Sequence, residues 1–361
     1  MSAGTTHRPG PDGGNPRTGT GTGTGNARVG IAPPGRPGPG PSASPGRRSV
    51  RALPVLALVG VLVSVPFWLG SYPVSLLSGV LAFAVLAMSV SLLTGVTGLP
   101  TLGQAGYFGV GGYTAAIIST SVSTVGPVQL VAAAVLSAAV AAVTGLLAVR
   151  ARGVTFLMLT LAIGELVETA ASRWTSLTGG SDGYSAEMVR PFFGLPELRL
   201  DGLVYFYALG VALVLLAVVL VLVRSPFGLT LRGIRDNEAR MRALGYPVTA
   251  HLLTAYTLAG ALAGIGGGLW VSVQDYISPA DAGFGTSALA LLAVTIGGVR
   301  SIWGGCLGAA VVLLTRDYLG GLLGGHGPLL LGCLFVLAVY LLPRGIAGIR
   351  RRRRAGGDGD E

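Results

Sequence analysis

Apolar runs long enough to cross a lipid bilayer recur along most of this chain. A helix needs about 20 mainly apolar residues to span the hydrocarbon core, and such runs follow one another from Ala52 to Leu342. Charged residues make up only 11% of the 361 residues and hydrophobic residues 51%, whereas about 25% of an average soluble domain is charged. The sequence therefore predicts an all-α integral membrane protein.

About ten transmembrane helices are predicted from these runs. The windows are 52–70, 73–94, 101–121, 125–149, 154–172, 203–223, 251–273, 286–299, 302–319 and 328–343. The chain has 25 basic residues, all of them arginines, and cytoplasmic loops carry the basic excess of membrane proteins. With both termini in the cytoplasm, every arginine lies on the inner side except Arg173, Arg190, Arg199 and Arg316. This distribution favours an even number of spans.

Three regions are expected along the chain. Residues 1–49 are mainly Gly, Pro, Thr, Ser and Arg, and they lack the apolar side chains needed to offset chain entropy, so a disordered cytoplasmic tail is predicted. Residues 50–349 form the transmembrane domain, with a cytoplasmic loop at 224–250. Residues 350–361 form a tail that is first basic and then acidic. The arginines at 350–354 closely follow a span and have no aromatic residues among them, which favours contact with anionic membrane lipid and no nucleic acid.

The absence of lysine excludes one mechanism. A phosphate-binding loop of the form GxxxxGK[ST] needs its Lys at the β- and γ-phosphates, so no ATPase site of that kind exists in this chain. Cys306 and Cys333 stand alone in apolar stretches, and His7, His251 and His326 are scattered. We therefore expect no metal site, no bound cofactor and no catalytic residue.

Polar residues and helix breakers inside the predicted spans indicate a pathway. Pro100 and several glycines interrupt the span at 101–121, and unpaired backbone at membrane depth is tolerated only beside protein or a water-filled cavity. A broken or re-entrant helix is expected there, and Gln104 either faces the cavity or bonds to a neighbouring helix. Glu165 and Glu168 share one helical face. An interior polar role is favoured for Glu165, whereas Glu168 could reach the outer interface.

Glycines at every fourth position predict close helix packing rather than chemistry. Gly260, Gly264 and Gly268 form one series, and Gly304 with Gly308 forms another. Such a series puts a flat strip on one face of a helix, which lets the backbone of a neighbouring helix approach closely.

The most charged stretch between spans is 224–245. Arg232, Arg235, Glu238 and Arg242 recur at intervals of three to four residues, a spacing that predicts a short surface helix with its charges on one side. Charge alone leaves a simple solvated connecting helix equally open.

Five stretches carry a more specific signal: TLGQAGYFG at 101–109, TGGSDG at 178–183, the loop 227–245, GGVRSIWGGCLG at 297–308 and LPRG at 342–345. Together they resemble the branched-chain amino acid permease family of ATP-binding-cassette (ABC) importers, and the resemblance covers residues 81–350 in order. Within it, 232–245 looks like the coupling loop of such permeases. Arg240 and Arg242 depart from the family pattern, in which small or acidic residues are common.

The resemblance implies a heteromeric importer for branched-chain amino acids in the bacterial cell membrane. Its partners would be a sister permease subunit, two cytoplasmic ATP-binding subunits that hydrolyse ATP, and an extracytoplasmic substrate-binding protein. The implied coupling residues are Arg232, Arg235, Asp236, Glu238, Ala239, Leu244 and Gly245. The candidates for the pathway are Gln104, Glu165, Thr178, Gly179, Gly180, Ser181 and Asp182.

Two alternatives stay open. Permeases of the same architecture carry urea, short amides or other amino acids, and the sequence barely separates these substrates. A proton-coupled secondary carrier is a second class of function, suggested by Glu165 and Asp182 in or near the membrane. Such a carrier has no use for a docking helix in a cytoplasmic loop.

Overall fold

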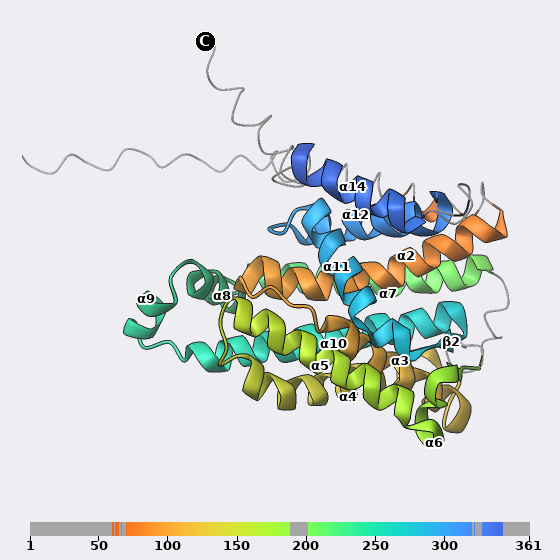
Figure 1. Cartoon of the computed structure of the whole chain (residues 1–361), viewed down its shortest axis with the longest axis horizontal. Coiled ribbons are helices and arrows are strands. Elements are labelled where there is room, and N and C mark those ends of the chain that lie inside the picture. The colour runs from red at the N-terminus through yellow and green to blue at the C-terminus, as the bar shows by residue number, and fades with distance from the viewer. Residues whose placement is uncertain are drawn as a thin grey trace, which may run out of the picture. The chain divides into compact units, whose positions relative to one another are not determined.

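The computed structural model describes residues 60, 62–64, 66, 70–187, 201–319, 321 and 327–341, all within the compact unit Ala57–Glu361. The predicted tails at 1–49 and 350–361, and most of the first predicted span, lie outside the described residues. Helices make up most of the described chain (Figure 1).

The long helices follow one another along the chain. They are α2 (Ser71–Val90), continued by the π-helical segment η1 (Ser91–Thr97), α3 (Gln104–Ser121), α4 (Gly126–Ala148), α5 (Val154–Arg173), α7 (Asp201–Arg224), α10 (Val248–Gln274), α11 (Phe284–Gly297), α12 (Ile302–Leu313), continued by the π-helical η4 (Leu314–Leu319), and α14 (Gly327–Leu341). The short elements are α6 (Thr175–Thr178), η2 (Gly180–Asp182), α8 (Pro226–Asp236), α9 (Glu238–Ala243), η3 (Pro279–Ala282) and the strands β1 (Tyr184–Ser185) and β2 (Tyr276–Ile277), which pair antiparallel.

Six helices in the described part of the chain are long and apolar enough to cross a membrane. They are Tyr72–Thr97, Gly126–Ala148, Val154–Arg173, Gly202–Arg224, Val248–Gln274 and Ile302–Leu319, and each coincides with a predicted window. The window 101–121 forms α3, which is rich in glycine and polar residues. The windows 286–299 and 328–343 overlap α11 and α14, of 14 and 15 residues. The chain is an all-α membrane protein in its described part.

Helix α10 lies at the centre of the packing and contacts α2, α3 and α4. Its glycine strip faces α4, because a Cβ atom on Gly260 would overlap the side chain of Ala141, and one on Gly264 would overlap Ser137. Helix α12 uses its glycines in the same way against α11, where Gly308 meets the backbone of Ala293. The predicted role of both strips in close packing is confirmed.

A buried set of hydroxyl groups joins the three central helices. The Tyr107 hydroxyl on α3 lies 2.6 Å from Oγ1 of Thr144 on α4 and 2.8 Å from the hydroxyl of Tyr256 on α10. These bonds satisfy polar groups that would be costly to bury alone.

The glycines of α3 were expected to break the helix, but α3 is continuous from Gln104 to Ser121. The irregular backbone is confined to 98–103, and the later glycines admit neighbours, such as Gly111 against the backbone of Gly264.

The connections fall into two groups at opposite ends of α10, whose 27 residues extend about 40 Å. The segment α8–α9 contacts both the end of η1 and the α4–α5 turn, beside the start of α10. The strands β1 and β2 and the segment η3 lie beyond its other end. We call these the α8–α9 end and the β1–β2 end, and Figure 1 shows them on opposite sides of the helices.

Candidate functional site

The charged segment between α7 and α10 forms two short helices rather than one. Ser225 begins α8, where its hydroxyl accepts a hydrogen bond from the Gly228 amide at 3.4 Å. Asn237 has an extended backbone and begins α9, its side chain accepting a hydrogen bond from the Arg240 amide at 2.9 Å. The prediction of one helix carrying all four charged residues is therefore wrong. Asn237 ends the first helix because its side chain supplies a cap for the second.

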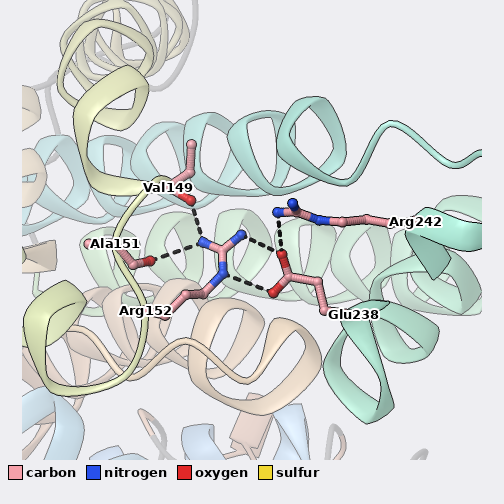
Figure 2. A network of polar contacts seen from close by, with 5 residues as sticks. All are labelled: Val149, Ala151, Arg152, Glu238 and Arg242. Atoms are coloured by element: carbon pink, nitrogen blue, oxygen red, sulfur yellow. Dashed lines mark hydrogen bonds and ion pairs between the residues drawn. The ribbon is translucent and has the colours of Figure 1, made fainter. Parts of the chain in front are cut away.

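Glu238 forms the centre of a polar network at the α8–α9 end (Figure 2). Arg152, in the turn between α4 and α5, donates from Nε to Oε2 at 2.9 Å and from Nη2 to Oε1 at 2.8 Å. Arg242 donates to the same Oε1 at 2.7 Å. The Nη1 group of Arg152 donates to the carbonyls of Val149 and Ala151. The carboxylate thus joins α9 to the α4–α5 turn.

The electrostatics of this network favour the ionised carboxylate. Hydrogen bonding from Arg152, together with the charges of Arg152 and Arg242, lowers the pKa of Glu238 below its ordinary value of 4.5, although partial burial opposes this effect. A guanidinium that meets a carboxylate through two parallel hydrogen bonds fixes both its distance and its orientation. At neutral pH the network is therefore a directional link between two connecting segments.

Arg235 provides a second link at this end. Its Nη1 group donates to the carbonyl of Gly95 in η1. Gly98 has a φ of +77°, and a Cβ atom there would lie 2.8 Å from Cγ of Arg235. Only glycine suits this position, because the backbone is left-handed and the arginine stem is close. Of the other predicted coupling residues on α8, Arg232 and Asp236 are exposed.

The remaining predicted coupling residues lie on the open surface. Ala239, Leu244 and Gly245 are all exposed, and the side chain of Leu244 is 66% accessible. Their contact with another subunit remains a prediction.

Gln104 is fully buried at the first turn of α3. Its Oε1 accepts a hydrogen bond from Ser89 at 3.4 Å, and its Nε2 has no partner. Nearby amides are held by hydroxyl groups, since the Ala105 amide donates to Ser287 and the Leu102 amide to Thr160. Of the two predicted roles, the bond to a neighbouring helix is present through Ser89 of α2, and a place facing the pathway remains a prediction.

The two glutamates of α5 differ in exposure. Glu165 lies on an exposed face of the helix with Met158 and Leu166, whereas Glu168 is half-buried and its carboxylate lies against Gly283. Within the single chain, Glu165 therefore faces outward from the helix packing. Its role in the pathway remains a prediction.

The stretch Thr178–Asp182 lies at the β1–β2 end. The buried Thr178 hydroxyl donates to the carbonyls of Ala171 and Trp174, at 2.6 and 2.7 Å. Gly179 and Gly180 have positive φ angles of +77° and +68°. Ser181 and Asp182 are exposed, and the Asp182 carbonyl accepts a 2.6 Å hydrogen bond from the Tyr276 hydroxyl. The structure therefore separates these residues from the coupling candidates by the length of α10.

Sequence reasoning missed Arg152 as the partner of Glu238. The two residues are 86 positions apart, and the available signal was only that both belong to predicted cytoplasmic segments.

Among the described residues, no group of three or more His, Cys, Asp or Glu side chains is placed to hold a metal ion.

The long apolar helices, joined by a charged segment outside the spans, define a multi-pass membrane protein. The chain belongs to the family described as "Branched-chain amino acid transport system / permease component", whose model matches residues 72–341. Its place is the bacterial cell membrane, and it is a transport protein rather than an enzyme.

Individual relatives agree with the family. The chain is 28% identical over 320 residues to the high-affinity branched-chain amino acid transport system permease protein LivM of Salmonella typhimurium, covering 82% of this chain and 75% of that protein. Identity to LivM of Escherichia coli is 27% with the same coverage. A probable branched-chain amino acid transport permease protein, LivH of Methanocaldococcus jannaschii, is 25% identical over 73% of this chain and 88% of its own length. No solved structure matches the chain significantly.

Proposed function

We propose that this chain is the permease subunit of an ABC importer that carries branched-chain amino acids. The family and the names of its relatives support this substrate class. The single observation that carries the coupling part of the proposal is the link from Glu238 to Arg152, which connects the exposed α8–α9 segment to the α4–α5 turn. A movement imposed on α9 from outside would reach α4 and α5 through this link.

The proposed topology has ten spans with both termini in the cytoplasm and the α8–α9 end facing inward. Support comes from the arginines at this end. Arg152, Arg224, Arg235 and Arg300, all predicted to be cytoplasmic, belong to elements that meet there. The basic excess of a membrane protein is expected on that side. The Thr178–Asp182 stretch would then face the outside.

The proposed partners are a sister permease, two cytoplasmic ATP-binding subunits and an extracytoplasmic substrate-binding protein. The chain itself would bind no cofactor, and ATP would be hydrolysed by the partners. The exposed face of α5 supports a sister subunit, because a carboxylate such as Glu165 is costly against lipid and stable against a partner or a water-filled pathway. The two α5 helices would then border the pathway, with Gln104 as a buried polar group nearer the centre of this chain.

The direct test is transport by the reconstituted complex. Proteoliposomes containing this chain and its partners should take up leucine or valine when ATP is supplied on the side of the ATP-binding subunits. A partner ATPase lacking its phosphate-binding lysine serves as the control and should support no uptake. Uptake that continues without ATP, or that follows an imposed proton gradient, would show a secondary carrier instead.

A further inference from the structure

A cavity of about 430 Å³ lies at the α8–α9 end, apart from the Glu238 network. Its walls come from η1, the end of α7, α8, and the turn that joins α11 to α12. This volume is within the range of roughly 300 to 1,000 Å³ found for small-molecule sites. The cavity is thus large enough for a small polar ligand.

The cavity wall carries a strong excess of positive charge. Arg224, Arg232, Arg235 and Arg300 line it, against the single carboxylate of Asp236. Arg235 is engaged with the carbonyl of Gly95. The other three guanidinium groups make no ion pair or side-chain hydrogen bond in the part of the chain that the structure describes. Four positive groups from three separate segments therefore surround a space with little internal compensation.

Ser91 is a buried polar residue in the wall of this cavity. It lines the same cavity and is only 1% exposed, yet its hydroxyl has no hydrogen-bond partner. Buried hydroxyl groups without a partner are uncommon. Ser91 also begins the π-helical segment η1, and π-helical turns within helices occur frequently at functional sites. The Oγ atom of Ser91 lies close to Gly305 of α12, so this hydroxyl is packed between the helices behind the wall of the cavity.

The position of the cavity and the apolar part of its wall place it at the membrane interface. The cavity lies where α7 ends, at Arg224, and where α12 begins, at Ile302. Both helices are membrane spans, so the cavity lies at the level of lipid headgroups. Leu220 and Trp303 line it as well, and tryptophan is enriched at the membrane interface.

We propose that this cavity binds a phosphate group, either that of an anionic phospholipid headgroup or that of a small soluble phosphate. A phosphate offers several acceptor oxygens to the planar guanidinium groups, which bind such groups with two parallel hydrogen bonds. Basic pockets between spans on the cytoplasmic side bind anionic headgroups in this way. The bound phosphate would join α8 to η1 and α12, beside the proposed coupling residues, whichever solute the permease carries.

Lipid retention by the purified full chain tests the proposal. The chain is mixed in detergent with phosphatidylglycerol or phosphatidylcholine of matched acyl chains, and native mass spectrometry measures bound lipid. Wild type should retain phosphatidylglycerol about tenfold more than phosphatidylcholine, because each arginine near an anionic headgroup adds to the attraction. The Arg224→Gln/Arg300→Gln variant should lose this preference, and Arg224→Lys/Arg300→Lys should keep most of it because the charges remain.

A charge-matched control removes two exposed arginines outside the cavity, Arg150→Gln/Arg240→Gln, and should bind like wild type. A parallel arm measures the shift in thermal unfolding with inorganic phosphate and glycerol 3-phosphate. A shift that depends on Arg224 and Arg300, without any lipid preference, would identify a soluble phosphate as the ligand. Equal retention by wild type and the cavity variant, with no shift from either phosphate, would overturn the proposal. Neither partners nor ATP are used, so that failure would leave the transport proposal standing.

Discussion

Glu238 connects two segments of the α8–α9 end through one carboxylate. It is 29% exposed and Arg152 is 35% exposed, so solvent screens their attraction and the pair contributes only about 1 kcal/mol to stability. The geometric consequence is larger than the energetic one. Arg152 is itself held to the carbonyls of Val149 and Ala151. Its two parallel hydrogen bonds to Glu238 therefore keep α9 in a defined position against the α4–α5 turn.

Reversing the charge at this position should uncouple the complex without unfolding the permease. In Glu238→Arg, three arginines would repel one another, and substrate-stimulated ATP hydrolysis should fall about tenfold, as expected when roughly 1.4 kcal/mol of coupling is lost. The swap Arg152→Glu/Glu238→Arg rebuilds the ion pair and should recover part of the activity, as a double-mutant cycle requires for a direct contact. ATPase assays on the reconstituted complex measure both.

Arg240→Glu is the matched control, because it reverses the charge of an exposed residue of α9 that takes no part in the network. It should leave coupling near the wild-type level.

Acid titration adds a second check. Since the folded pKa of Glu238 is lowered, the pair stabilises the protein fully above the ordinary value of 4.5, and this contribution is lost as the pH falls through the lowered pKa. A Glu238→Arg complex with normal coupling would rule out the link.

Among the helices, the contact between α10 and α4 depends on the absence of side chains. At Gly264, an added Cβ atom would overlap Ser137 and would come within 2.7 Å of the carbonyl oxygen of Ala133. Backbone at this distance cannot move aside without separating the two helices. The glycine series therefore sets the distance between the central helices, which also hold the buried hydroxyl groups of Tyr107 and Tyr256.

Gly264→Val should destabilise the permease by about 1 to 3 kcal/mol, the usual cost of overpacking a well-filled interior. Thermal unfolding in detergent measures the effect as a lower melting temperature. Gly210→Val on α7 is the control, because no atom lies within 4 Å of a Cβ placed there, and it should unfold near the wild-type temperature. Equal melting temperatures for the two variants would show that α10 and α4 are not held together at this glycine.

Much of the helix pattern could be predicted from the sequence, because hydrophobic length and glycine spacing are local properties. The strip at Gly260, Gly264 and Gly268 is an example. The break at Asn237 could not be predicted from charge spacing, because it depends on a side-chain cap that competes with helix continuation. The partner of Glu238 could not be predicted either, since Arg152 reaches it only after α4, α5, α7 and α10 have packed.

At the scale of the whole molecule, three connections that the sequence assigns to the same side of the membrane also lie together in the structure. The arginine rule assigns the α4–α5 turn, the 224–250 loop and the α11–α12 turn to the same side, and the structure brings all three to the α8–α9 end. The rule groups these connections because it uses the charge balance of many loops at once. The pathway is harder to predict, because the surroundings of an exposed residue such as Glu165 are not supplied by this chain alone.

Cysteine labelling tests this sidedness directly. In a Cys306→Ala/Cys333→Ala background, which removes both free cysteines of the described chain, Ser181→Cys at the β1–β2 end should react with a membrane-impermeant maleimide in intact cells. Ala243→Cys at the α8–α9 end should react only after permeabilisation. Arg150→Cys should behave in the same way, and it serves as a second cytoplasmic position in case a partner subunit covers Ala243. All three residues are exposed in the chain. Labelling of Ala243→Cys in intact cells would place the coupling segment outside, where no ATP-binding subunit could reach it.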